Sequence, residues 1–362
     1  MSPTPPIRFG IWAPHRGPWV IDREHERHHA SFQLARDVVL SAERAGFATA
    51  LVAQHTINPD DHASEVLDAW TAAAALAALT RSIEIIAAIK PRLHHPAVLA
   101  KMALGIEDIS NGRFALNVVS AWYKPELELS GIGFPAHDER YAYTAEWLGI
   151  VKTLLAGETL THRGTSFALD DFALRPTSRS RARPFIYTGG ESGSGRKLAV
   201  DLADCWLING RPPEDLQPMI ADVANRPRQG APLQFGTTGY ALVRETEAQA
   251  NEELAHWLAI QDGYRDLVRR KADSIDPHAQ TIHYVKQYGQ NRLIGANGGT
   301  IPGFVGSYDQ VAERIVQFYR IGITTFLLSF YPMIEEQEHF AREIFPRVRS
   351  LLGNGAIVDG VA

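Results

Sequence analysis

Side chains able to bind ligands recur just after the apolar segments of this sequence. They carry indole, imidazole, amide, amine and hydroxyl groups or are glycines, and they stand at Trp12, His15, Gln54, His55, Lys90, Asn117, Ser120, Trp122, Gly189, Gly190, Ser192, Asn209, Tyr240, Ser329 and Tyr331. The set is rich in amides and aromatic rings. It has no pair of carboxylates for general acid–base catalysis and no Ser-His-Asp combination. Such a set suits a flat heteroaromatic cofactor that carries the reaction itself.

A phosphate site is indicated by the glycine pair Gly189–Gly190, which Ser192 follows at the start of a helical pattern. Backbone N–H groups at a helix start favour an anion, and Arg140 adds positive charge. Each residue also has a purely structural interpretation, such as a tryptophan that caps a core. The prediction therefore depends on the joint occurrence of these residues at successive strand ends.

The elements that must position these residues alternate regularly. Eight apolar, strand-like segments occur at 8–14, 48–53, 82–90, 114–119, 184–190, 205–209, 233–244 and 324–330. Helical patterns separate them at 31–45, 66–79, 96–109, 139–155, 192–202, 213–224 and 307–319, and a closing one follows at 336–352. This order predicts an α/β fold, a (β/α)8 TIM barrel, in a single domain over 1–362. Residues 159–167 predict a β-hairpin, and about 246–303 a helical and loop insertion.

The fourth strand-like segment shows how such a barrel builds a binding face. It follows the turn pair Asn111–Gly112 and is apolar except for Asn117. A polar residue inside a buried strand needs a partner, so Asn117 is a candidate ligand contact. A doubly wound sheet would alternate in the same way, but no G-x-G-x-x-G turn follows the first segment.

Bulk properties exclude several classes of protein. The chain has 362 residues and a formal net charge of −5, which argues against a nucleic-acid partner. Its one cysteine, Cys205, excludes an internal disulfide and is expected to be a small buried residue. His25 and His29 are spaced for one helix face, but no third ligand accompanies them, so we predict no metal site. The absence of a signal peptide or an apolar run of membrane length predicts a cytoplasmic protein without a membrane partner.

Several motifs together resemble the bacterial luciferase-like flavin monooxygenases. These are D-I-S-N-G-R at 108–113, N-V-V-S-A-W at 117–122, H-D-E-R-Y at 137–141, T-G-G-E-S at 188–192 and F-V-G-S-Y-D-Q-V-A-E-R-I at 304–315. The resemblance runs from about residue 9 to 347. Within the family it is most similar to the dimethyl sulfone monooxygenases and pyrimidine oxygenases, with the alkanesulfonate monooxygenases close by.

The resemblance implies a luciferase-like barrel and a two-component FMN-dependent monooxygenase. Reduced FMN would come from a separate NAD(P)H-dependent flavin reductase, and molecular oxygen would be the cosubstrate. The family's FMN contacts match Gln54, His55, Asn117, Glu126, Arg140, Tyr141 and Ser192. Trp12, His15, Trp122, Tyr240 and Tyr331 would line the substrate pocket. The flavin carries the chemistry, so catalytic residues are left open, with His55 and Asn117 as candidates. A homodimer or homotetramer is expected, and the glycine-rich segment 291–303 is expected to close over the flavin.

One departure from the family concerns the substrate. Alkanesulfonate monooxygenases carry F-G-x-R-x-H on the seventh strand and Y-P-H after the eighth, whereas this chain has neutral Thr238, Tyr240 and Met333 at those positions. A buried anion without a partner costs several kcal/mol. We therefore predict a small neutral substrate, most simply dimethyl sulfone, converted to methanesulfinate and formaldehyde. His15 and Arg16 keep an alkanesulfonate as an alternative, a pyrimidine is another, and a non-catalytic flavin-binding protein is the alternative outside enzymes.

Overall fold

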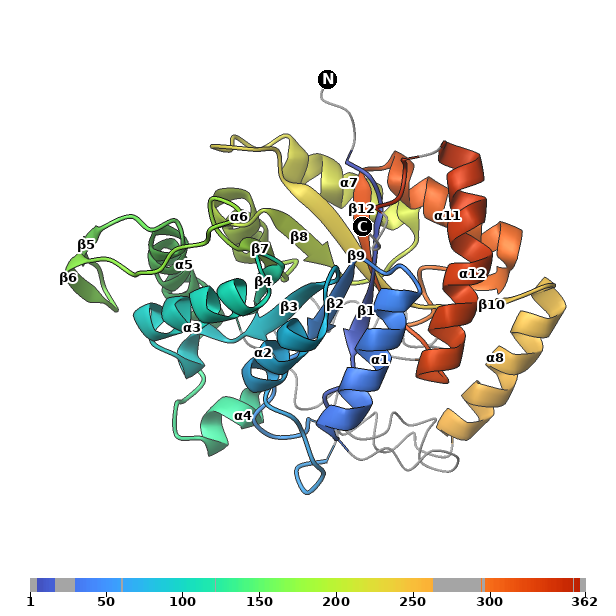
Figure 1. Ribbon diagram of the computed structural model, residues 1–362, viewed down its shortest axis with the longest axis horizontal. Coiled ribbons are helices and arrows are strands. Elements are labelled where there is room, and N and C mark those ends of the chain that lie inside the picture. Colours follow the sequence, from blue (N-terminus) through green and yellow to red (C-terminus); the bar gives the residue numbers. More distant parts are fainter. Residues whose placement is uncertain are drawn as a thin grey trace.

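Eight parallel strands close into a barrel at the centre of the molecule (Figure 1). The computed structural model describes residues 5–16, 30–59, 61–120, 122–262, 294, 297–353 and 355–358. In the order β1-β12-β9-β8-β7-β4-β3-β2, the strands are β1 (Arg8–Ala13), β12 (Ile323–Ser329), β9 (Gln234–Tyr240), β8 (Cys205–Ile208), β7 (Phe185–Thr188), β4 (Phe114–Val118), β3 (Glu84–Ile89) and β2 (Thr49–Val52). Nearly all of their residues are buried, as expected for parallel strands covered on both faces. The predicted (β/α)8 barrel is confirmed.

Helices lie around the outside of this barrel (Figure 1). They are α1 (Phe32–Arg44), α2 (Ala69–Leu79), α3 (Pro96–Ile109), α5 (His137–Leu155), α6 (Gly193–Leu202), α7 (Pro213–Ala224), α11 (Tyr308–Arg320) and α12 (Met333–Leu352). Several begin at a side chain that accepts a hydrogen bond from the first helical turn, namely Ser31, Asp68, Ser192 and Ser307. Such caps satisfy N–H groups that have no partner within the helix, so the sequence marks these starts well.

Smaller elements depart from the repeating pattern. The predicted hairpin is present as β5 (Leu160–Arg163) and β6 (Ala168–Phe172). The seventh apolar segment, 233–244, was predicted as one strand, but it divides into β9 and β10 (Leu242–Arg244). β10 leaves the barrel and pairs with β11 (Val305–Ser307). Two short elements were not predicted, α4 (Lys124–Leu129) and a 3-10 helix at Pro91–Leu93.

The insertion before the last βα unit begins with α8 (Glu247–Asp262), which lies at the periphery of the molecule (Figure 1). Most of its remainder, 263–293 and 295–296, lies outside the described residues, as do His25 and His29. Within the described ranges no three histidine, cysteine or acidic side chains form a potential metal site. No helix in those ranges is long and apolar enough to cross a membrane.

Side chains from β2, β3, β4, β7, β8 and β12 meet in the barrel interior. Leu51, Ile86, Ala115, Tyr187, Cys205, Leu207 and Leu327 form one cluster there. Burial raises the pKa of the Cys205 thiol, which agrees with its predicted structural role. Toward the amino-terminal ends of the strands, Glu84 pairs with Arg8 at 3.1 Å and accepts a hydrogen bond from Tyr187 at 3.0 Å. The charges of Arg8 and Glu84 therefore compensate one another at the end opposite the predicted site.

Candidate functional site

Parallel strands bring their carboxyl-terminal ends to one face of the barrel, which we call the strand-end face. Gln54 and His55 follow β2 there, and Lys90 follows β3. Gln54 Oε1 accepts a hydrogen bond from the Lys90 backbone N–H at 2.7 Å. The Lys90 ammonium lies 3.2 Å from His55 Nδ1 and donates to Glu126 of α4. We call His55, Lys90 and Glu126 the Lys90 cluster, and all three side chains are buried.

Glu126 joins the Lys90 cluster as a well-bonded carboxylate. Its Oε1 accepts from the Thr56 backbone N–H at 2.5 Å and from the Thr56 hydroxyl at 3.1 Å. Burial lowers the pKa of the Lys90 ammonium, while the Glu126 charge and hydrogen bond oppose that shift. Three donors therefore surround the Glu126 carboxylate, and its charge favours the protonated form of Lys90.

Aromatic rings enclose His55. The His15 ring stacks on it with centroids 5.7 Å apart and planes 15° apart. The Trp122 ring meets it edge-on at 5.9 Å and 84°. Tyr123, also edge-on, bonds to His62 through its hydroxyl at 2.6 Å. The predicted substrate-pocket residues His15 and Trp122 therefore lie directly beside the predicted flavin contact His55.

Asn117 lies in β4, in register with Ala88 of β3 and Tyr187 of β7. Its side chain is only 6% exposed, and its Oδ1 has no hydrogen-bond donor among the described residues. Trp12, a predicted pocket residue on β1, packs against the apolar cluster in the barrel interior. A buried amide oxygen without a donor is costly, so Asn117 is a candidate for an external partner at this face.

The predicted phosphate residues gather at the adjacent starts of α5 and α6. Ser192 accepts from the Gly195 N–H at 3.1 Å, and Ser194 donates to Asp138 at 3.1 Å. The Tyr141 hydroxyl packs against Gly190, where a Cβ atom would lie 2.3 Å from its oxygen. Gly190 also has a φ of +107°, so both its conformation and its neighbour require glycine.

Arg140 is buried beside this helix start. Its Nη1 donates to the Pro135 carbonyl at 2.6 Å, and its guanidinium lies 3.9 Å from the centroid of the Phe134 ring. Backbone N–H groups and a guanidinium are together typical of an anion site.

A second buried carboxylate at this face, Glu191, was not predicted from the sequence. Glu191 accepts from the Asn209 N–H at 3.0 Å and pairs with Arg211. Burial raises the pKa of Glu191, and Arg211 opposes the shift. No pair of carboxylates was expected among the strand-end residues, but Glu126 and Glu191 are both present at this face, and each is paired with a cation. Each carboxylate pairs with a cation from a different part of the chain, so no local sequence motif predicts the pair.

A third group of predicted residues lies at the ends of β9 and β12. Tyr240 and Tyr331 both pack edge-on against Trp257 of α8, each with centroids 5.7 Å apart. Trp257 was not predicted, because the helical pattern of the insertion gives no sign of the barrel residues that it meets.

The described part of the glycine-rich segment, 297–303, lies against the same strand ends. Gly210 N–H donates to the Asn297 carbonyl at 3.0 Å, and the Thr238 hydroxyl donates to the same oxygen. Tyr240 N–H donates to Gly299 at 2.7 Å. This segment is therefore held by the backbone and side chains of β8 and β9, and Thr238 is one of its anchors.

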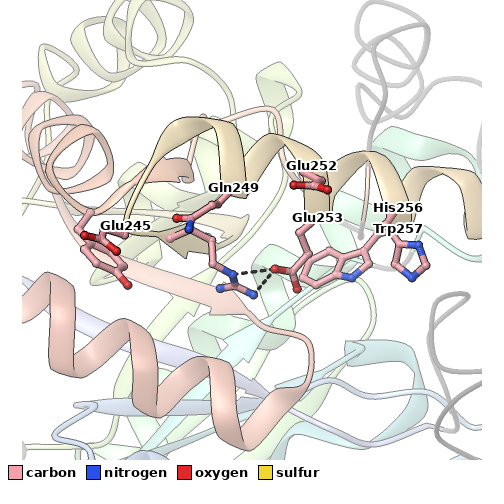
Figure 2. A pocket seen from close by; sticks show the side chains of 8 residues that line it. Glu245, Gln249, Glu252, Glu253, His256 and Trp257 are labelled. Carbon is pink, nitrogen blue, oxygen red and sulfur yellow. Dashed lines mark hydrogen bonds and ion pairs between the residues drawn. The ribbon is translucent and has the colours of Figure 1, made fainter.

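A separate cavity of about 600 Å³ lies beside α8 (Figure 2). Arg244 crosses it to Glu253 at 2.7 Å and also pairs with Glu336 at 2.9 Å. As defined by the described residues, its lining includes none of the residues predicted for the site. Through these two ion pairs Arg244 joins Glu253 of α8 to Glu336 of α12.

Comparison with known proteins agrees with this architecture. The family model described as luciferase-like monooxygenase matches residues 7–325. The chain belongs to this family. It is 30% identical over 353 residues to an FMNH(2)-dependent dimethylsulfone monooxygenase of Pseudomonas putida, covering 96% of each protein. A protein of the same name from Pseudomonas fluorescens (strain Pf0-1) is 28% identical over 352 residues, covering 95% of each.

Among solved structures, the EDTA monooxygenase from Chelativorans sp. BNC1 superposes with a TM-score of 0.80 at 17% identity, over 98% of this chain and 96% of that one. This likeness extends the agreement in fold to the whole barrel. The predicted family and enzyme class are confirmed. The individual ligand contacts of this luciferase-like monooxygenase stay predictions. The predicted residues lie in three groups: around the Lys90 cluster, at the starts of α5 and α6, and at the ends of β9 and β12.

Proposed function

We propose that this protein is a two-component FMN-dependent monooxygenase that acts on dimethyl sulfone. Dimethyl sulfone, reduced FMN and oxygen would give methanesulfinate, formaldehyde, oxidised FMN and water, with one oxygen atom entering the substrate. The observation that carries the proposal is the similarity, over nearly the whole chain, to two proteins named FMNH(2)-dependent dimethylsulfone monooxygenase.

Two features of the strand-end face fit FMN. Asn117 Oδ1 is a buried acceptor without a donor among the described residues, and a flavin ring carries N–H donors. The start of α6, with Gly190, Ser192 and the nearby Arg140, fits a phosphate. Gln54, His55 and Glu126 would complete the ring side of the site, and Tyr141 the phosphate side.

The bound flavin would supply the reaction with oxygen, and the protein would supply the surroundings. Burial of His55, Lys90 and Asn117 excludes water from the ring side. Trp12, His15, Trp122, Tyr240 and Tyr331 offer apolar surfaces to a small substrate. Because Glu126 compensates the charge of Lys90, the Lys90 N–H donors can lie beside the cofactor without an unpaired charge.

The neutral residues of β9 and α12 support a neutral substrate. Thr238 and Tyr240 are buried, and Met333 begins α12. A sulfonate would find no charge at these three positions, whereas the sulfone oxygens of dimethyl sulfone need only hydrogen-bond donors. This argument favours a sulfone over an alkanesulfonate.

The test is anaerobic mixing of the protein and reduced FMN with oxygenated buffer, followed by flavin absorbance and formaldehyde. Formaldehyde formation that depends on dimethyl sulfone supports the proposal. Product only from methanesulfonate or uracil would replace the substrate and keep the enzyme class. Binding of reduced FMN without any product from the three compounds would favour a non-catalytic flavin-binding protein.

We also propose that the chain folds as one barrel domain, works in the cytoplasm, and receives reduced FMN from an NAD(P)H-dependent flavin reductase. A homodimer or homotetramer is proposed from the family resemblance. Val98 and Ile109 are exposed apolar residues on α3, and a partner subunit could cover this helix face. Sedimentation analysis tests the assembly: a monomer at micromolar concentration would contradict it.

A further inference from the structure

The contact between Lys90 and His55 in the Lys90 cluster bears on which ring nitrogen of His55 carries the proton. Lys90 Nζ lies 3.2 Å from His55 Nδ1. An ammonium group only donates hydrogen bonds, so Nδ1 must accept. In a neutral imidazole the other ring nitrogen, Nε2, then carries the proton. The Glu126 carboxylate favours the charged form of Lys90 and lies 3.9 Å from the same Nδ1 atom.

We propose that Lys90 is a positioning residue that holds His55 as the neutral tautomer with its proton on Nε2, while Glu126 balances the charge. The structure supports this because all three side chains are nine-tenths or more buried, and each comes from a separate βα unit. Protonation of His55 at Nδ1 would bring two cationic donors together at 3.2 Å, which the ammonium opposes.

The other described groups around His55 do not fill this role. His15 meets the face of the His55 ring, and Trp122 and Tyr123 meet it edge-on. Within the described ranges, the charged side chains of Lys90 and Glu126 lie within 4 Å of the His55 ring. Glu126 alone would favour a protonated His55, whereas Lys90 favours the neutral form and lies closer to Nδ1.

The consequence for catalysis rests on the proposed function. His55 is a predicted flavin contact, and a fixed Nε2–H would make it a hydrogen-bond donor toward the cofactor side of the face. A tautomer with the proton on Nδ1, or an imidazolium, would offer a different pattern of donors or charge.

The experiment is nuclear magnetic resonance titration of the flavin-free, full-length protein carrying ¹⁵N-labelled histidine. Spectra of His55→Gln identify the His55 signals by their loss. In the wild type we expect Nε2 protonated and Nδ1 accepting. Lys90→Met leaves Glu126 beside the imidazole, so the titration midpoint of His55 should rise by about one pH unit or more. The double variant Lys90→Met/Glu126→Gln removes both charges and should return the midpoint toward the wild-type value.

Lys90→Gln separates charge from hydrogen bonding, because its amide N–H can still donate to Nδ1. It should retain the tautomer while raising the midpoint, and it also serves if Lys90→Met does not fold. A wild-type His55 with its proton on Nδ1, or an unchanged midpoint in a folded Lys90→Met or Lys90→Gln variant, overturns the proposal. These measurements need no substrate, so the inference and the proposed function can fail separately. If the enzyme turns over dimethyl sulfone, the acid limb of its pH profile should shift upward in Lys90→Met by the same amount.

Discussion

The side-chain oxygen of Asn117 has no donor among the described residues, and this leads to two predicted effects of opposite sign. Replacing Asn117 with leucine keeps a similar side-chain volume and removes this buried oxygen. An unsatisfied buried polar group costs about 1–3 kcal/mol, so the flavin-free protein should become more stable or stay equally stable. If the oxygen accepts from the flavin, the same change removes one net hydrogen bond of about 0.5–1.5 kcal/mol. FMN affinity should then fall roughly 2- to 13-fold.

The assay pairs urea unfolding of the flavin-free protein with anaerobic titration of reduced FMN. Thr49 offers a matched control: it begins β2, at the opposite end of the barrel, and its buried hydroxyl also has no partner among the described residues. Thr49→Val, which is nearly isosteric, should gain stability without any change in FMN affinity. The difference between the two variants isolates the effect of position.

Two results would refute the reasoning. Asn117→Leu binding reduced FMN as tightly as the wild type would show that the oxygen does not serve the cofactor. A loss of stability in Asn117→Leu, together with a gain in Thr49→Val, would show that Asn117 already has a partner in the free protein.

Three further changes test other parts of the molecule. Gly190→Ala places a methyl group 2.3 Å from the Tyr141 hydroxyl at a φ of +107°. It should lower FMN affinity, measured by titration, at least tenfold, a loss of about 1.4 kcal/mol or more. In the control Gly193→Ala a Cβ would meet no atom within 4 Å, so the affinity should stay within about twofold of the wild type. Burial alone would raise the pKa of Glu43, but hydrogen bonds from three backbone N–H groups before β3 lower it below the ordinary 4.5. Its stabilising effect is therefore present above about pH 4.5 and lost as the pH falls through the lowered value. Glu43→Gln should destabilise at pH 7 and match the wild type in strong acid, and equal unfolding free energies at pH 7 would contradict this. Thr238→Arg should not raise dimethyl sulfone turnover, because a neutral substrate gives the new cation no partner and the change also removes an anchor of the 297–303 segment. A gain in kcat/KM for the sulfone would contradict the proposal of a neutral substrate.

The regular parts of the fold could be predicted because their signals are local. A buried parallel strand is a short apolar run, and helix starts such as Ser192 and Ser307 carry a capping side chain. The division of β9 from β10 could not be predicted, because the apolar run continues through Ala241 while the backbone changes its pairing partner. The six-residue α4 lies in a loop rich in glycine and proline, where periodicity is too short to detect.

The candidate site divides along the same line. Positions at strand ends, such as Gln54, His55 and Asn117, follow from the order of elements, because parallel strands must bring their ends together. The contacts between those positions do not. Lys90 and Glu126 are 36 residues apart and belong to different βα units, so their pairing appears only when the barrel closes. The same holds for Trp257, which reaches Tyr240 from the insertion.

Charge pairing at the strand-end face bears on substrate choice more directly than any single residue. Lys90 already donates to Glu126, and Arg211 to Glu191. A sulfonate that drew either of these cations from its buried carboxylate would leave that carboxylate uncompensated, at a cost of several kcal/mol. Dimethyl sulfone needs no cation and leaves both pairs intact. We therefore expect kcat/KM for dimethyl sulfone to exceed that for methanesulfonate at least tenfold, a difference of about 1.4 kcal/mol. Comparable values for the two substrates, measured by coupled formaldehyde assays, would mean that a sulfonate is neutralised by a group other than these two paired cations.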